Sequence, residues 1–118
     1  MFEVSVEASF SAAHYLREYK GKCENMHGHN WKVKVVYKAK KVDKQGMVID
    51  FTILKNALNK ILMEVDHKVL NDLPYFKKAN PTSENIAKYI YEKLKTKSLK
   101  LKAVSVWETD TSCAKYYE

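Results

Sequence analysis

The chain has 118 residues, of which 46% are hydrophobic and 30% charged, with only three Gly and two Pro. That length suits one domain with a modest core and excludes two, and the composition is that of a soluble globular protein rather than a disordered one. The formal net charge of +7 indicates a surface that attracts anions, either a nucleic acid or a phosphorylated small molecule. We therefore expect a single domain over residues 1–118.

The chain is expected to be cytoplasmic and to have no membrane partner. It contains no run of roughly 18 apolar residues, which a membrane span needs, and its N-terminus lacks the pattern of a secretion signal. Its two cysteines, Cys23 and Cys113, lie far apart in the sequence and are expected to be free thiols.

Two long segments alternate between apolar and polar side chains, as half-buried antiparallel strands do. Residues 2–10 place apolar side chains at even positions, and residues 29–40 place them at odd positions with mostly lysine between them. Residues 15–25 have no clear period and predict a long loop. A turn at 43–46 followed by residues 47–51 predicts a third strand, paired with the second in a hairpin.

Two amphipathic helices are predicted next. From Thr52 the apolar spacing changes to three and four residues, with Asp50 or Thr52 as the N-cap. A second helix begins after Thr82, whose hydroxyl suits an N-cap. We interpret both apolar faces as core packing, and the predicted buried face of the first helix consists of Ile53, Leu54, Ala57, Leu58, Ile61, Leu62 and Val65.

Residues 99–109 predict the last strand, in which a change of parity indicates a bulge or burial on both faces. Residues 113–118 form a tail to which we assign no role. The predicted order of strands and helices indicates a small α+β domain.

Three histidines predict a metal site. In an extended segment alternate side chains project to the same side, so His27 and His29 can bind one metal ion. His14 follows the first alternating run on its apolar side, and three neutral imidazoles with an open fourth position are the arrangement that catalytic zinc uses. Cys23 is then a thiol beside the metal.

Two further positions carry acidic side chains that could take part in catalysis or in ligand binding. Asp66 and His67 are adjacent where the first helix ends, and both side chains can turn toward one cavity, although exposed pairs of this kind are common. Glu108 stands between Trp107 and Thr109 in an apolar strand, and a buried carboxylate needs a partner such as a ligand with paired N–H donors. From these residues alone, the chain is a zinc-dependent α+β enzyme with a thiol and an acidic anchor.

Several short motifs follow one another almost from end to end. They are Ala-Ala-His at 12–14, Cys-x3-His-Gly-His at 23–29, Ile-Asp-Phe at 49–51, Val-Asp-His-x3-Leu-Asn at 65–71, Asn-Pro-Thr-Ser-Glu-Asn at 80–85 and Trp-Glu-Thr at 107–109. Together they resemble the 6-pyruvoyltetrahydropterin synthase and 6-carboxytetrahydropterin synthase family. The resemblance implies the tunnelling fold, in which a four-stranded antiparallel sheet carries two helices on one face. Trimers of such subunits form a β-barrel, and two trimers stack into a homohexamer.

The resemblance also implies a role for each motif. The zinc ligands are His14, His27 and His29, the catalytic residues are Cys23, Asp66 and His67, and the substrate-binding residues at the pterin are Glu108, Thr82 and Ser83. The implied enzyme is a lyase that acts on 7,8-dihydroneopterin triphosphate. Because Cys23 is present, family members that replace the thiol with Glu are excluded.

Within the family, the compact chain looks closest to the 6-carboxy-5,6,7,8-tetrahydropterin synthase of queuosine biosynthesis, which releases acetaldehyde and triphosphate. The alternative is a 6-pyruvoyltetrahydropterin synthase, which eliminates triphosphate and rearranges the side chain.

A remote alternative is a non-catalytic basic protein that binds a metal or nucleic acid. The lysines at 32, 34, 38 and 40 share one strand face, which we interpret as a solvated face, while Trp31 and Tyr37 take the opposite parity. A nucleic-acid binder more often interleaves aromatic and basic side chains on one face, so no nucleic-acid partner is expected. A structural zinc site is normally closed by four protein ligands.

Overall fold

The structure is a computed structural model that describes residues 1–22, 24–95 and 100–118. Its elements, in chain order, are β1 (Phe2–His14), β2 (His27–Ala39), α1 (Phe51–Leu62), β3 (Lys68–Val69), the 3-10 helix η1 (Leu70–Asp72), α2 (Pro74–Lys78), α3 (Ser83–Leu94), β4 (Lys100–Thr109) and β5 (Ser112–Tyr116). The strands form one sheet in the order β3-β1-β2-β4-β5, in which β3 pairs with β1 in parallel and all other neighbours are antiparallel. Within the described ranges, no helix combines the length and the apolar surface that crossing a membrane requires.

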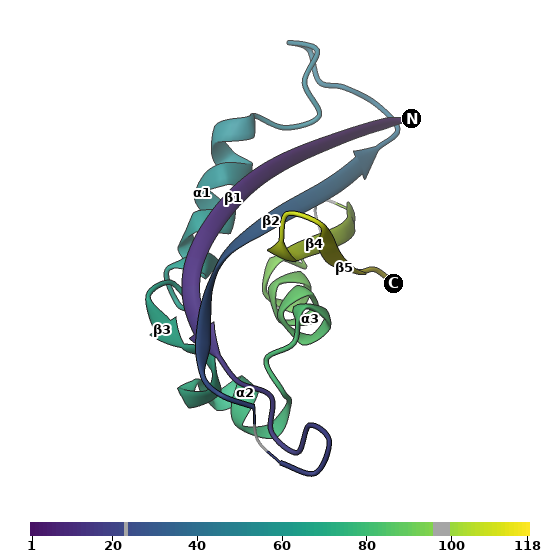
Figure 1. The fold of residues 1–118 in the computed structure, drawn as a ribbon. Helices are drawn as coiled ribbons and strands as arrows, with labels where there is room; N and C mark the ends of the chain where they lie inside the picture. Colours follow the sequence, from purple (N-terminus) through teal and green to yellow (C-terminus); the bar gives the residue numbers. More distant parts are fainter. Residues whose placement is uncertain (23, 96–99) are drawn as a thin grey trace.

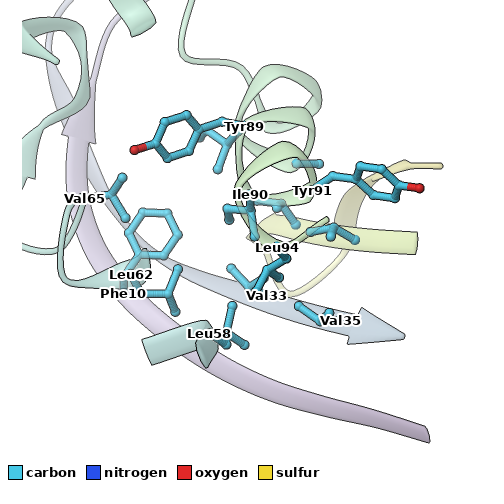
Figure 2. Close-up of a cluster of buried hydrophobic side chains, with 14 of the residues drawn as sticks. Phe10, Val33, Val35, Leu58, Leu62, Val65, Tyr89, Ile90, Tyr91 and Leu94 are labelled. Atoms are coloured by element: carbon cyan, nitrogen blue, oxygen red, sulfur yellow. The ribbon is translucent and has the colours of Figure 1, made fainter. Parts of the chain in front are cut away.

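The sheet has one covered face and one open face. Figure 1 shows α1 alongside β1 and α3 beside β4 and β5, with the loop after β1 at the far end of the molecule from the N-terminus. The buried residues of β1 have even numbers and those of β2 have odd numbers, which confirms the predicted alternation. Phe10, Val33, Leu58 and Ile90 belong to the core on the covered face, between the strands and the two helices (Figure 2).

The open face carries charged side chains from both long strands. Glu3 is the antiparallel partner of Lys38, and Glu7 is the partner of Lys34. Lys102 from β4 forms an ion pair with Glu3. Opposite charges on neighbouring strands attract each other, so β1 partly neutralises the lysine face that the sequence predicts.

The predicted third strand at 47–51 is wrong. Asp43 folds the preceding loop back on itself, because its carboxylate accepts hydrogen bonds from the backbone N–H groups of Gln45 and Met47 at 2.9 and 3.0 Å. Asp50 then caps α1 by accepting from the backbone N–H of Thr52 at 2.8 Å. The chain therefore passes from a turn directly into a helix, and no hairpin forms.

The predicted buried face of α1 is too wide. Leu54, Leu58 and Leu62 are buried, whereas Ile53 is 58% exposed. A groove of about 460 Å³ separates α1 from α3, and both Ile53 and Ala57 line it. The apolar side chains on that side of α1 face the groove because α3 does not fill it.

The C-terminal segment supplies a strand. Residues 112–116, which carry no predicted role, form β5 and pair with β4. The predicted bulge is confirmed. Val36 and Tyr37 of β2 pair with Ala103 and Leu101 of β4, so Lys102 between them has no pairing residue in the described strand β2. Residue 99, the predicted start of this strand, lies outside the described residues. The four long strands β1, β2, β4 and β5 thus form the implied antiparallel sheet, which is not closed on itself.

Candidate metal centre

The three predicted metal ligands meet where β1 ends and β2 begins. His14 is the antiparallel partner of His27, and His29 lies opposite Ala12. All three side chains project to the covered face, and their ligand nitrogens lie within 4.8 Å of one another. The structure therefore confirms that one metal ion could be held by these residues.

Two of the three imidazoles are oriented for metal binding by hydrogen bonds on the side away from the other ligands. The Nδ1 atom of His14 lies 2.7 Å from the Pro81 carbonyl oxygen, and that of His27 lies 2.9 Å from the Asn25 carbonyl oxygen. Each Nδ1–H can donate to its carbonyl, which leaves Nε2 with a free lone pair. Burial lowers the pKa of His14 below its usual value, which favours the neutral form that binds a metal.

The Nε2 atoms of the three histidines are better suited to coordinate a metal ion than to form hydrogen bonds with one another. The Nε2 atoms of His14 and His27 are 3.1 Å apart, and the buried Nε2 of His29 has no hydrogen-bond partner among the described residues. A tetrahedral zinc with Zn–N bonds of about 2.0 Å separates two ligand nitrogens by about 3.3 Å. A bound ion would give all three nitrogens a partner, and they lie within 4.8 Å of one another.

Trp31 forms the floor of this group. Its ring is fully buried, its Nε1–H donates to the Ala12 carbonyl at 3.2 Å, and the rings of His14 and His29 meet it edge to face at 4.8 and 5.4 Å. Its parity with His29 could have identified it in the sequence. Pro81 could not have been found, because it acts through a backbone carbonyl.

Glu108 approaches the histidines from β4. Trp107 pairs with Cys113 and Thr109 pairs with Ser112, so Glu108 lies at a second bulge, where it has no pairing residue in the described strand β5. Its carboxylate oxygens lie 3.5 Å from His14 Nε2 and 3.7 Å from His29 Nε2. The side chain is 35% exposed, so the sequence-based expectation of a buried carboxylate is wrong. The bulge directs this side chain to the rim of the metal site instead of into the core.

A cavity of about 330 Å³ lies beside Glu108 and is lined by Leu16, Thr82, Ser83, Glu84, Glu108, Ser112, Cys113 and Ala114. The structure therefore brings the three predicted substrate-binding residues to one cavity. Thr82 and Ser83 reach it because α3 begins there, and Thr82 caps the helix by accepting from the Asn85 N–H at 3.1 Å.

Asp66 and His67 lie elsewhere. The Ser11 N–H donates to Asp66 Oδ1 at 2.8 Å, and the His67 N–H donates to the Ser11 carbonyl at 2.6 Å. His67 Nδ1 is 3.0 Å from Asp66 Oδ2, and the His67 side chain is 81% exposed. The Ser11 N–H, followed by the His67 side chain, holds the pKa of Asp66 below its usual range.

His67 lines a different cavity from that of Glu108, Thr82 and Ser83. The cavity has a volume of about 490 Å³, and its lining includes Ser11, Ala13, Asn30 and His67, together with the metal ligand His29. Ser11 and Asn30 are cross-strand partners of the parity that points to the open face, and their side chains share a hydrogen bond of 2.7 Å. By this parity Ser11, which holds the pair, points to the open face, whereas the side chains of the three metal ligands project to the covered face.

The sequence matches the family of 6-pyruvoyl tetrahydropterin synthases over residues 3–118. The chain belongs to this family. It is 34% identical to the 6-carboxy-5,6,7,8-tetrahydropterin synthase of Haemophilus influenzae over 141 aligned positions that cover 100% of both proteins. Its fold matches the 6-pyruvoyl tetrahydropterin synthase of Caenorhabditis elegans with a TM-score of 0.82 and 38% identity, covering 100% of this chain and 97% of the other.

The family also includes a relative with a third activity. The chain is 38% identical to the dihydroneopterin monophosphate aldolase of Pyrococcus furiosus, over 86% of this chain and 84% of the other. The tetrahydropterin synthases among these relatives are lyases that act on a small pterin, and this pterin synthase is an enzyme of the same kind. Its predicted catalytic thiol, Cys23, lies outside the residues that the structure describes, so that role stays a prediction.

Replacing His27 or His29 with Ala should abolish stoichiometric metal binding, because two imidazoles alone cannot hold the ion against a chelator. Elemental analysis after dialysis against a weak chelator would measure it. His67→Ala is the matched control and should keep one metal per chain, because His67 lies on the open face. Full metal content in the His27 and His29 variants would contradict the assignment.

Proposed function

We propose that this pterin synthase is a zinc-dependent 6-carboxy-5,6,7,8-tetrahydropterin synthase. It would convert 7,8-dihydroneopterin triphosphate to 6-carboxytetrahydropterin with release of acetaldehyde and triphosphate, in queuosine biosynthesis. The observation that carries the proposal is the three-imidazole group next to the cavity of Glu108. The full-length similarity to the Haemophilus synthase favours the carboxy enzyme.

In this proposal Glu108 anchors the pterin. A carboxylate offers two acceptor oxygens, which can take up the adjacent N–H donors of a pterin ring in a charge-assisted pair of hydrogen bonds. Thr82 and Ser83 lie in the same cavity and would contact the ring. Since the Glu108 oxygens also lie within 4 Å of two histidines, a ring held there would extend its side chain toward the metal ligands.

The proton transfers would be carried out by the catalytic residues. Zinc held by His14, His27 and His29 would polarise the hydroxyls of the substrate side chain and make the neighbouring C–H groups more acidic. The Cys23 thiol would accept the proton in its thiolate form, which is the form that acts as a base. Asp66 would orient His67, which exchanges a proton with the substrate or the thiol.

Asp66 and His67 are held by Ser11 on the open-face side, whereas the metal ligands project to the covered face, so we infer that the pair serves the metal site of a second copy. The proposed assembly is a cytoplasmic homohexamer built from two trimeric barrels. In the described part of the chain, residues 2–10 of β1 have no partner on their outer edge, and β5 ends the sheet on the other side. Joining sheets edge to edge would satisfy these exposed backbone groups.

Product analysis tests the proposed reaction. Acetaldehyde and triphosphate should appear together, in equal amounts, from 7,8-dihydroneopterin triphosphate. Triphosphate without acetaldehyde would favour the pyruvoyl activity, for which the similarity to the Caenorhabditis elegans synthase is the supporting observation. Turnover of dihydroneopterin monophosphate in place of the triphosphate would favour the activity of the Pyrococcus relative.

Glu108→Ala should weaken neopterin binding by about tenfold to a hundredfold, because two charge-assisted hydrogen bonds are lost. Glu108→Gln keeps the size and one acceptor and should give a smaller loss. Titration calorimetry would measure both, and metal content should stay at one per chain. Unchanged neopterin affinity in Glu108→Ala would show that the carboxylate only supports the metal ligands.

Cys23→Ala and His67→Ala should each abolish turnover, while Cys113→Ala should retain it. If the two catalytic groups of one site come from different copies, co-expressing the two inactive variants should restore about a quarter of the wild-type rate, since half of the copies supply each residue. Mixed assemblies that remain inactive would contradict a shared site. Wild-type turnover in Cys23→Ala would remove the thiol from the mechanism.

A further inference from the structure

Three consecutive residues after β1 form hydrogen bonds mostly with side chains instead of with another strand. Tyr15, Leu16 and Arg17 each have both their backbone N–H and their backbone C=O hydrogen-bonded. Asn71 bonds both groups of Tyr15, at 3.0 and 2.9 Å, and Asn80 bonds both groups of Arg17, at 3.0 and 3.1 Å. A side-chain amide can do this because it presents one acceptor and one donor side by side, as a peptide group does.

Leu16, between these two residues, forms both of its backbone hydrogen bonds with Glu24. The Leu16 N–H donates to Glu24 Oε1 at 3.1 Å, and the Glu24 N–H donates to the Leu16 carbonyl at 2.9 Å. The backbone of Leu16 is thus fixed, and Leu16 lines the cavity beside Glu108. Leu16 is an apolar wall of the cavity in which the pterin is proposed to bind.

Asn80 connects this wall to the segment at which α3 begins. Its carbonyl accepts from the Thr82 N–H and from the Asn85 side chain, both at 2.8 Å, so Asn80 is part of the turn that begins α3. Thr82 and Ser83 follow directly and line the cavity. The Arg17 guanidinium donates to the Ala79 carbonyl at 3.2 Å and ties the same two segments together again.

We propose that Asn80 is a positioning residue for pterin binding, which sets the distance between the Leu16 wall and the Thr82–Ser83 wall. The inference rests on the proposed function, because it concerns the width of the proposed pterin cavity. Asn80 does not line that cavity, so it acts through the Arg17 backbone. A flat ring needs two walls at a fixed separation, and a looser wall would admit water and lose contact with the ring.

Asn71 provides a matched control. It makes the same two hydrogen bonds to the neighbouring Tyr15, but it belongs to η1, which contributes no residue to this cavity. Asn71 is 4% exposed, so Asn71→Ala should lower the thermal midpoint at least as much as Asn80→Ala does. A merely structural role would predict that ligand affinity follows stability in both variants.

The experiment measures neopterin affinity, metal content and thermal midpoint in the full chain. Asn80→Ala should weaken neopterin binding about tenfold, and Asn71→Ala by less than about twofold, with one metal per chain in both. Asn80→Asp keeps the acceptor for the Arg17 N–H and loses the donor, so its affinity should also fall, and it serves if Asn80→Ala does not fold. Equal affinity losses in the Asn80 and Asn71 variants would overturn the inference.

A double-mutant cycle with Leu16 tests the route of the effect. Leu16→Ala removes the wall that Asn80 positions, so adding Asn80→Ala should weaken neopterin binding less than about twofold further. Additive losses would show that Asn80 does not act through Leu16. If the wild type itself fails to bind neopterin, the proposed function fails; if it binds and the Asn80 variants bind equally well, the positioning role alone fails.

Discussion

The uninterrupted pairing of β1 with β2 is the constraint on which the site depends. The register aligns His14 with His27 and places His29 opposite Ala12, so three imidazoles from two strands reach one point. A slip of one residue would send the histidines of one strand to the open face. The same slip would turn Trp31 out of the core, so the large apolar area buried by its ring also protects the register. Core packing and metal-ligand geometry are therefore set by the same strand pair.

Irregular features supply what the regular strands cannot. The bulge at Glu108 turns one carboxylate toward the histidines while the rest of β4 remains in the sheet. The amides of Asn71 and Asn80 continue the hydrogen bonding of β1 beyond its last strand partner, at Tyr15 and Arg17. In each case a departure from ideal secondary structure lies next to a residue of the candidate site.

Local periodicity predicts the long strands and the common face of the three histidines, and residue type predicts the cap at Thr82 and narrows the other cap to Asp50 or Thr52, of which Asp50 is the one observed. These features depend on neighbours within a few residues. The sheet face to which Asp66 and His67 belong depends instead on how the segment after α1 pairs with Ser11, 55 residues earlier. The strand expected at residues 47–51 does not form because a short apolar run fits a strand or a helix start equally well, and the cap at Asp50 decides between them.

The backbone conformation of His67 lowers the stability of the fold, although its side chain is proposed to act in catalysis. Its φ of 55° lies in the left-handed region, where a residue with a Cβ costs roughly 1 kcal/mol more than glycine. Selection for thermal resistance alone would favour Gly or Asn there, since both tolerate that conformation. Variants recovered from a stability screen would therefore be expected to lose this histidine early, and a thermostable relative that keeps it must obtain its resistance from other parts of the fold.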